Sequence, residues 1–156
     1  ETAEELTIRF AREGASLLVD ALDLIADGTA KPVAQDHSRA TYCSAIRKED
    51  GQIPWDADCE TIARMVRAYQ PWPRAYTYFG EKKLMICEAE AYPEEHQEHT
   101  APGTVVREVP GRGLFVAAGS GTLLVRRLQL EAKREMDWQA FLNGNPSVIG
   151  TRLGSS

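Results

Sequence analysis

The chain has 156 residues, of which 43% are hydrophobic and 26% charged, values typical of a soluble globular protein with one domain and a short extension. No apolar run is long enough to cross a bilayer and no signal-peptide pattern is present, which excludes a membrane protein. The net charge of −5, taken as a single number, argues against a nucleic-acid partner.

The distribution of charge changes this interpretation. Residues 1–30 carry two basic and seven acidic side chains, whereas residues 31–156 carry sixteen of each. The acidic excess therefore lies in one N-terminal segment, and the rest of the chain can still present a basic face.

Cysteine usage indicates the redox environment. The chain has three cysteines, Cys43, Cys59 and Cys87, an odd number whose spacing matches no zinc motif. We interpret them as reduced thiols and expect a cytoplasmic protein. The sequence begins at Glu1 rather than at a methionine, as expected for a piece of a longer protein.

A long amphipathic helix is predicted at the N-terminus. Thr2 and Glu5 have the spacing of a capping box, and Gly28 is suited to the position that follows the helix. Apolar residues recur between them at roughly helical spacing: Leu6, Phe10, Leu17, Leu18, Leu22 and Ile25. Residues 29–40 contain few large apolar groups and predict an extended linker.

The remaining chain is predicted to be mainly β. After a short strand at Thr41–Ile46 and a turn, Asp58 should cap a helix over residues 59–70, which Pro71 and Pro73 end. Runs rich in β-forming residues follow at 74–79, 82–91, 104–109, 113–118 and 122–130, and a last helix should start near Asp137. The predicted fold class is mainly β with flanking helices: a small OB-like β-barrel preceded by a long N-terminal helix and an extended linker.

The sequence offers no convincing set of catalytic residues. His96 and His99 have a ligand-like spacing, but no third ligand is placed to complete a metal site, and a solvated acidic loop explains them better. The neighbouring pair Glu94–Glu95 has nothing to desolvate one carboxylate. We therefore expect no catalytic residue, no metal and no bound cofactor in this chain.

Four basic doublets are the strongest candidates for function: Arg47 and Lys48, Lys82 and Lys83, Arg126 and Arg127, and Lys133 and Arg134. In a strand at most one of two neighbours faces the core, so each strand doublet must expose at least one charge. They fit a surface that follows a phosphate backbone, although an ordinary solvated surface explains them equally well. Trp72, Tyr76 and Tyr78 could stack on bases, but packing in the core is favoured for all three.

Several stretches, taken together and in order, resemble one enzyme family. They are "QDHSRATYCSAIRKEDGQIPWDADCETIARMVRAYQPWPRAYTYFGEKKLMI", "APGTVV", "LLVRRLQLEAKREMDWQAFLNG" and "GTRLG". The chain resembles the junction and C-terminal domain of methionyl-tRNA formyltransferases. The resemblance divides it into residues 1–28, similar to the last helix of the catalytic domain, a linker at 29–40, and a tRNA-binding barrel at 41–156.

The resemblance implies an enzyme that transfers a formyl group from 10-formyltetrahydrofolate to methionyl initiator tRNA. The family places its catalytic residues and its folate-binding motif in an N-terminal domain, whose motifs this sequence lacks. The chain is accordingly expected to position initiator tRNA through phosphate contacts and to pair in cis with a catalytic domain. If that partner is absent, helix 3–27 is expected either to self-associate with a second copy of the chain or to fold back on the barrel. Within this resemblance, Trp72 is expected in the core.

Departures from the family pattern put single RNA contacts in doubt. Ala45 stands where a lysine is usual, and Ala132 stands where a glycine is usual, although Lys133 and Arg134 keep the charge of that motif. Two alternatives remain open. One is a related folate-dependent formyltransferase or hydrolase acting on a small molecule, and the other is a non-catalytic OB-like interaction module.

Overall fold

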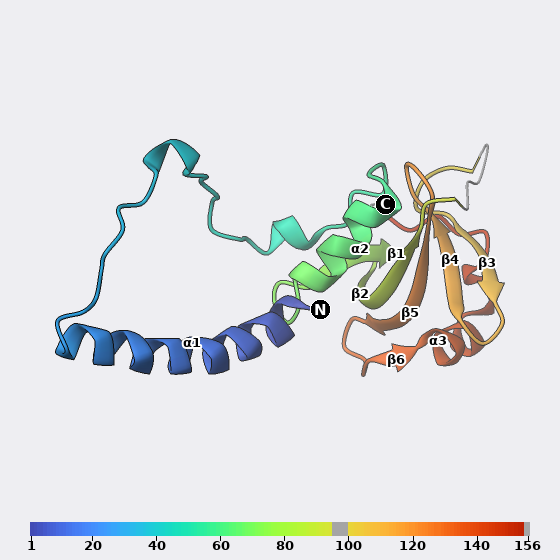
Figure 1. Cartoon of the computed structure of the whole chain (residues 1–156). Helices are drawn as coiled ribbons and strands as arrows, with labels where there is room; N and C mark the ends of the chain where they lie inside the picture. The colour runs from blue at the N-terminus through green and yellow to red at the C-terminus, as the bar shows by residue number, and fades with distance from the viewer. Residues whose placement is uncertain (95–99, 155–156) are drawn as a thin grey trace. The chain divides into compact units, whose positions relative to one another are not determined.

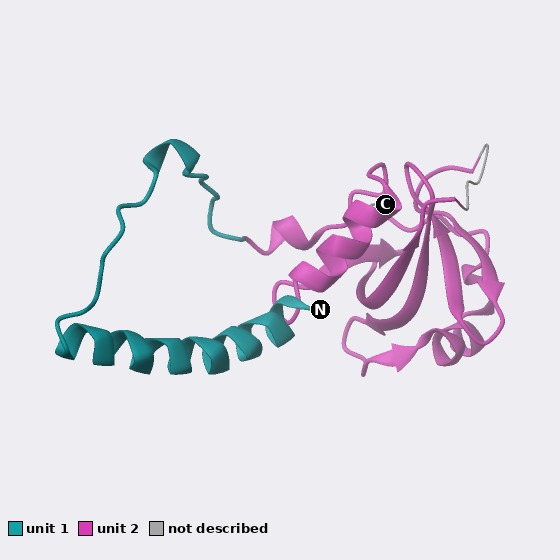
Figure 2. Cartoon of the chain, viewed as in Figure 1, with its two compact units in different colours: residues 1–46 teal, residues 47–156 magenta. Residues whose placement is uncertain are grey.

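The computed structural model describes residues 1–94 and 100–154, and its chain forms two compact units, residues 1–46 and residues 47–156 (Figure 2). The second unit therefore begins six residues later than the predicted barrel domain. The predicted strand at Thr41–Ile46 is wrong, because these residues have no regular structure. The loop residues Glu95, His96 and His99, considered above as carboxylate and metal candidates, lie outside the described residues.

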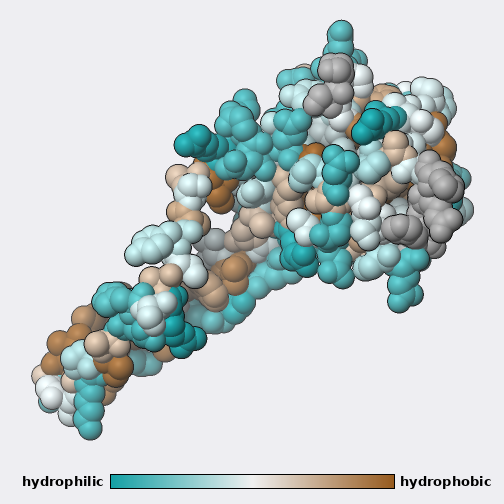
Figure 3. Space-filling view, turned by 90° about the horizontal axis from the view of Figure 1, so that it is seen from above, coloured by the Kyte–Doolittle hydropathy of each residue, from teal (hydrophilic) through white to brown (hydrophobic). Residues whose placement is uncertain are grey.

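The first unit is built around helix α1, Ala3–Ala26 (Figure 1). The predicted capping box is confirmed: the Thr2 hydroxyl accepts from the Glu5 amide, and the Glu5 carboxylate accepts from the Thr2 amide. The chain leaves the helix through Gly28, whose φ of +67° favours glycine. No residue of α1 is buried, and hydrophobic side chains are exposed on this unit (Figure 3).

The second unit contains one antiparallel sheet with short helices. Its elements are η2 (Glu49–Gly51), α2 (Cys59–Ala68), β1 (Ala75–Phe79), β2 (Lys82–Tyr92), β3 (Val105–Val109), β4 (Gly113–Ala117), β5 (Thr122–Leu130), β6 (Met136–Asp137), α3 (Trp138–Gly144) and η3 (Pro146–Val148). The sheet order is β1-β2-β5-β4-β3, with β6 paired to β5 (Figure 1). This confirms the mainly β class with flanking helices.

Two helices of this unit start at aspartate caps, of which Asp58 was predicted as a cap and Asp137 only as the approximate start. The Asp58 carboxylate accepts from the Thr61 amide at 2.7 Å, and the Asp137 carboxylate accepts from the Ala140 amide at 2.7 Å. Helix α2 then places its apolar face, which includes Ile62 and Val66, in the core against β2.

The sheet is open, because the strand order ends at β1 on one side and at β3 on the other. The C-terminal segment 150–154 contacts both edges. On the β3 side, Val105 donates its amide to the Thr151 carbonyl at 2.9 Å, and Leu153 donates to Gly103 at 2.8 Å. On the β1 side, the Gly154 amide donates to the Tyr78 carbonyl at 3.0 Å. This segment, rather than a strand pair, spans the two edges.

The core forms between the inner face of the sheet, α2, α3 and the C-terminal segment. Its largest fully buried side chains are Phe141, Ile62, Leu84, Ile86, Leu123, Leu124, Leu128, Val66, Val105, Val116, Val125 and Val148. The prediction that Trp72 packs in this core is wrong, since the side chain is 59% exposed. Tyr76 is buried as expected, and Tyr78 is half-buried.

The cysteines are free thiols, and burial raises the pKa of Cys59 and, to about 12, that of Cys87. Both thiols therefore stay protonated and unreactive at neutral pH. Within the described ranges, no helix has the length and apolar character that crossing a membrane requires.

Candidate nucleic-acid interface

The turn that carries Arg47 and Lys48 is held against the start of the sheet. Gly51 fits tightly there, because a Cβ atom on it would lie 2.4 Å from the Arg74 carbonyl oxygen. Directly after the turn, the Ile53 amide donates to the Tyr76 carbonyl at 2.7 Å. The first doublet is thereby fixed beside β1, although Lys48 and Tyr76 are 28 positions apart in the sequence.

This turn brings Lys48 close to Lys83 of the second doublet. Lys83 extends over the Tyr76 ring, with its Nζ 3.5 Å from the ring centroid, in a cation–π contact. Burial lowers the pKa of Lys83, and the charge of Lys48 lowers it further, while Glu131 acts in the opposite direction. Lys83 thus lies beside a second cation, Lys48, with Glu131 as an opposing charge.

A chain of hydrogen bonds brings the last doublet to the same end of the sheet. Arg74 donates from Nη1 to Gln129 Oε1 at 2.7 Å, and Gln129 donates from Nε2 to the Lys133 carbonyl at 2.7 Å. The Glu131 amide also donates to the Lys83 carbonyl at 2.8 Å. We call Lys48, Arg74, Lys83, Lys133 and Arg134 the basic end of the sheet.

The turn at the basic end holds one residue in a conformation that favours glycine. Ala132 has a φ of +60°, in the left-handed region where a side chain is disfavoured. Lys133 and Arg134 follow directly and are exposed. A glycine would hold this turn without backbone strain.

The third doublet differs from the others, because acidic side chains neutralise it. Arg126 Nη2 lies 2.8 Å from Glu90 Oε1, and Arg127 Nε lies 2.7 Å from Glu135 Oε1. The hydrogen bond to Glu135 raises the pKa of Arg127. Glu88 adds a third carboxylate 4.0 Å from Arg126, so the immediate surroundings carry more negative than positive charge.

Sequence reasoning missed Arg74, because the doublet criterion ignores isolated basic residues. Its position was still recognisable: it directly follows Pro-Trp-Pro and directly precedes β1. The remaining predicted residues, Arg47 and Lys82, are exposed at the surface.

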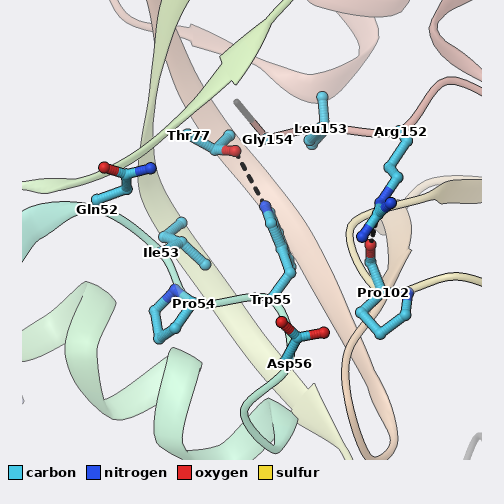
Figure 4. A pocket seen from close by; sticks show the side chains of 10 residues that line it. All are labelled: Gln52, Ile53, Pro54, Trp55, Asp56, Thr77, Pro102, Arg152, Leu153 and Gly154. Carbon is cyan, nitrogen blue, oxygen red and sulfur yellow. Dashed lines mark hydrogen bonds between the residues drawn. The ribbon is translucent and has the colours of Figure 1, made fainter. Parts of the chain in front are cut away.

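The second unit also contains a pocket of about 430 Å³ between the segment after η2, β1 and the C-terminal segment (Figure 4). Trp55 lines this pocket and donates from Nε1 to Thr77 Oγ1 at 2.9 Å, while Arg152 donates from Nε to the Pro102 carbonyl at 3.0 Å. Among the described residues that line it there is no histidine, cysteine or serine. These lining residues provide no nucleophile with an adjacent base.

Comparisons with known proteins agree with one another. The profile of the family "Formyl transferase, C-terminal domain" matches residues 45–146. A curated methionyl-tRNA formyltransferase from Treponema denticola is 35% identical over 152 residues, covering 96% of this chain and 47% of that protein. One from Methylacidiphilum infernorum is 39% identical over 158 residues, covering 99% of this chain and 48% of that protein. The chain thus spans about half the length of the curated relatives that it matches.

Among solved structures, a variant of HypX from Aquifex aeolicus aligns with a TM-score of 0.61 and 19% identity. The alignment covers 85% of this chain and 23% of HypX. At this identity the similarity concerns the fold alone.

Proposed function

We propose that this chain, which belongs to the family of formyl transferase C-terminal domains, positions tRNA for a methionyl-tRNA formyltransferase. The whole enzyme would transfer a formyl group from 10-formyltetrahydrofolate to methionyl initiator tRNA in the cytoplasm. Its catalytic residues and folate site would lie in an N-terminal domain of the same polypeptide. The support for this proposal is the identity of 35% and 39% to relatives of that name.

The observation that carries the role of this chain is the basic end of the sheet. Residues far apart in the sequence converge there through direct hydrogen bonds, and Lys48 lies close enough to Lys83 to lower its pKa. Lysine and arginine side chains that hold no internal carboxylate are available for phosphate oxygens. Phosphate contacts of this kind fix the register of an RNA without reading its sequence.

The eight predicted residues are then not equivalent. Arg126 and Arg127 must leave carboxylate partners before they can contact a phosphate, so they should contribute less than the doublets at 47–48 and 133–134. Lys82 and Lys83 should make an intermediate contribution to RNA binding, because Lys83 is partly buried.

The first unit has a different proposed role. Residues 1–28 would complete the catalytic domain, and residues 29–40 would link it to the second unit. Apolar side chains all along α1, including Phe10 (57% exposed) and Leu17 (67% exposed), are available to a partner surface. Burying one such side chain is worth roughly 1.5–3 kcal/mol. Without the catalytic domain, helix 3–27 should pair with a second copy of the chain. Comparing the sedimentation of the Leu17→Glu variant with that of the wild-type chain tests this pairing.

A salt titration of tRNA binding tests the proposed function. Wild-type chain should bind initiator and elongator tRNA alike, with a Kd on the order of 10⁻⁴ to 10⁻⁶ M at physiological salt. The double variant Lys133→Ala/Arg134→Ala should weaken binding to both tRNAs. It should also reduce the slope of log affinity against log salt by about 2, roughly 1 for each lost phosphate contact. Arg47→Ala/Lys48→Ala should behave in the same way.

The control is Arg126→Gln/Arg127→Gln, which removes the same number of positive charges from paired positions. Its salt slope should change by less than that of either test variant. If both test variants keep the wild-type affinity and slope, the basic end is ordinary solvated surface and the proposed role is wrong.

A further inference from the structure

Trp72 is a large aromatic side chain that the fold leaves at the surface. It is 59% exposed, whereas Trp55 is only 6% exposed. Single exposed apolar residues are common, so exposure alone assigns nothing to Trp72. The way its loop is fixed, and the charges around it, carry the argument.

Three hydrogen bonds fix the loop that carries Trp72, between α2 and β1. The Arg74 amide donates to the Tyr69 carbonyl at 2.9 Å and closes the loop. Gln70 donates from Nε2 to the Cys87 carbonyl of β2 at 3.1 Å, and Arg74 donates from Nη1 to Gln129 of β5 at 2.7 Å. Pro71 and Pro73 flank the tryptophan and restrict φ on both sides. The indole is therefore presented by a rigid backbone, so ordering it on a ligand costs little entropy.

Arginines lie on both sides of this loop. Arg67 is near the end of α2 and Arg74 directly precedes β1, whereas Arg64 is paired with Glu60. Arg74 is connected through Gln129 to Lys133, so the loop adjoins the basic end of the sheet. A flat aromatic face next to phosphate-binding cations is the arrangement that binds unpaired nucleotides, because the base stacks while the cations hold its backbone.

We propose that Trp72 is a stacking site for one unpaired RNA base, next to the phosphate contacts of the basic end. This inference rests on the proposed function for the identity of the RNA as tRNA. It goes beyond phosphate positioning, because stacking requires a base that is not paired in an RNA helix. The stacking contact also does not depend on salt concentration. If the indole instead contacted a protein partner, replacing Trp72 would leave RNA binding unchanged.

The test compares Trp72→Ala and Trp72→Phe with wild type, using the full chain. The ligands are tRNA, a single-stranded oligouridylate and an RNA duplex of equal length. Trp72→Ala should weaken binding of the oligouridylate by about fivefold to a hundredfold, the range for loss of one stacked base. Trp72→Phe should retain most of the affinity, since phenylalanine also stacks. Duplex binding and the salt slope should stay at wild-type values, because no charge is removed.

Ile149→Ala serves as the matched control, since it removes another exposed apolar side chain, 41% exposed, from the same unit. It should leave all three affinities unchanged. A second measurement does not depend on affinity: an oligonucleotide with 5-iodouracil, irradiated with wild-type chain at high concentration, should crosslink to Trp72.

The stacking site is refuted if Trp72→Ala binds the oligouridylate as wild type does, or if it weakens duplex binding equally. Crosslinking confined to other residues would also refute it. These results are separable from those of the proposed function. Wild-type chain that binds tRNA with the expected salt slope, together with a silent Trp72→Ala, refutes only the stacking site. Chain that binds no tRNA refutes the proposed function, while the crosslink still reports on Trp72.

Discussion

Replacing Leu153 with alanine should destabilise the second unit, because this side chain connects the C-terminal segment to the core. Leu153 is only 3% exposed and packs with the buried cluster of the sheet. Truncating a buried leucine to alanine costs about 2–5 kcal/mol in the free energy of unfolding, through lost burial and the cavity left behind. For a unit of this size, that corresponds to a melting temperature roughly 8–20 °C lower.

The position of Leu153 between two sheet edges makes the upper part of this range the expected result. Its amide bonds Gly103 on the β3 side, and the next amide, of Gly154, bonds Tyr78 on the β1 side. A leucine that no longer fills its site should loosen both connections together, so the loss should exceed that of an isolated core position.

Urea unfolding followed by tryptophan fluorescence measures the effect, since Trp55 lines the same pocket as Leu153. The matched control is Ile149→Ala, a branched aliphatic side chain four residues earlier in the chain that is 41% exposed. It should change the free energy of unfolding by about 0.5 kcal/mol or less. Equal destabilisation by the two variants would refute the view that the C-terminal segment is part of the core.

Four further predictions follow from the structure and the proposed function. The 156-residue chain, mixed with 10-formyltetrahydrofolate and methionyl initiator tRNA, should form no formylated product above background; turnover that survives repurification would contradict this. Burial lowers the pKa of Lys83 below its usual value of 10.5, so Lys83 loses its charge at a lower pH than exposed lysines. Affinity for tRNA should therefore begin to fall at a lower pH in wild type than in Lys83→Arg, and identical pH profiles would count against a role for Lys83. Ala132→Gly should raise the free energy of unfolding by up to about 1 kcal/mol, because it relieves a φ of +60°, and a clear loss in thermal unfolding would argue against that strain. Trp55→Phe should lower the free energy of unfolding by about 1–3 kcal/mol, because the buried Thr77 hydroxyl loses its hydrogen-bond donor. Unchanged stability in urea would show that this hydrogen bond contributes little.

The sequence by itself determined the features that depend on neighbouring residues. The capping box at Thr2 and Glu5 started α1, and the side chains of Asp58 and Asp137 started α2 and α3, because a cap acts within one helical turn. The bounds of β5, Thr122–Leu130, agreed with the prediction, since a run of β-forming residues that follows hairpin glycines is a local signal. The four basic doublets were visible for the same reason.

Only the tertiary structure decided which of these groups meet, because contacts across the sheet depend on strand order rather than on spacing. Arg74 and Gln129 are 55 residues apart in the sequence, and their hydrogen bond exists because β1, β2 and β5 are successive in the sheet. The same order gives Arg126 its carboxylate partners from β2. Trp72 lies in the loop between α2 and β1 and is 59% exposed, although its large apolar side chain favours burial. Hydrophobicity predicts that a residue favours burial, but the fold determines whether a buried position exists for it.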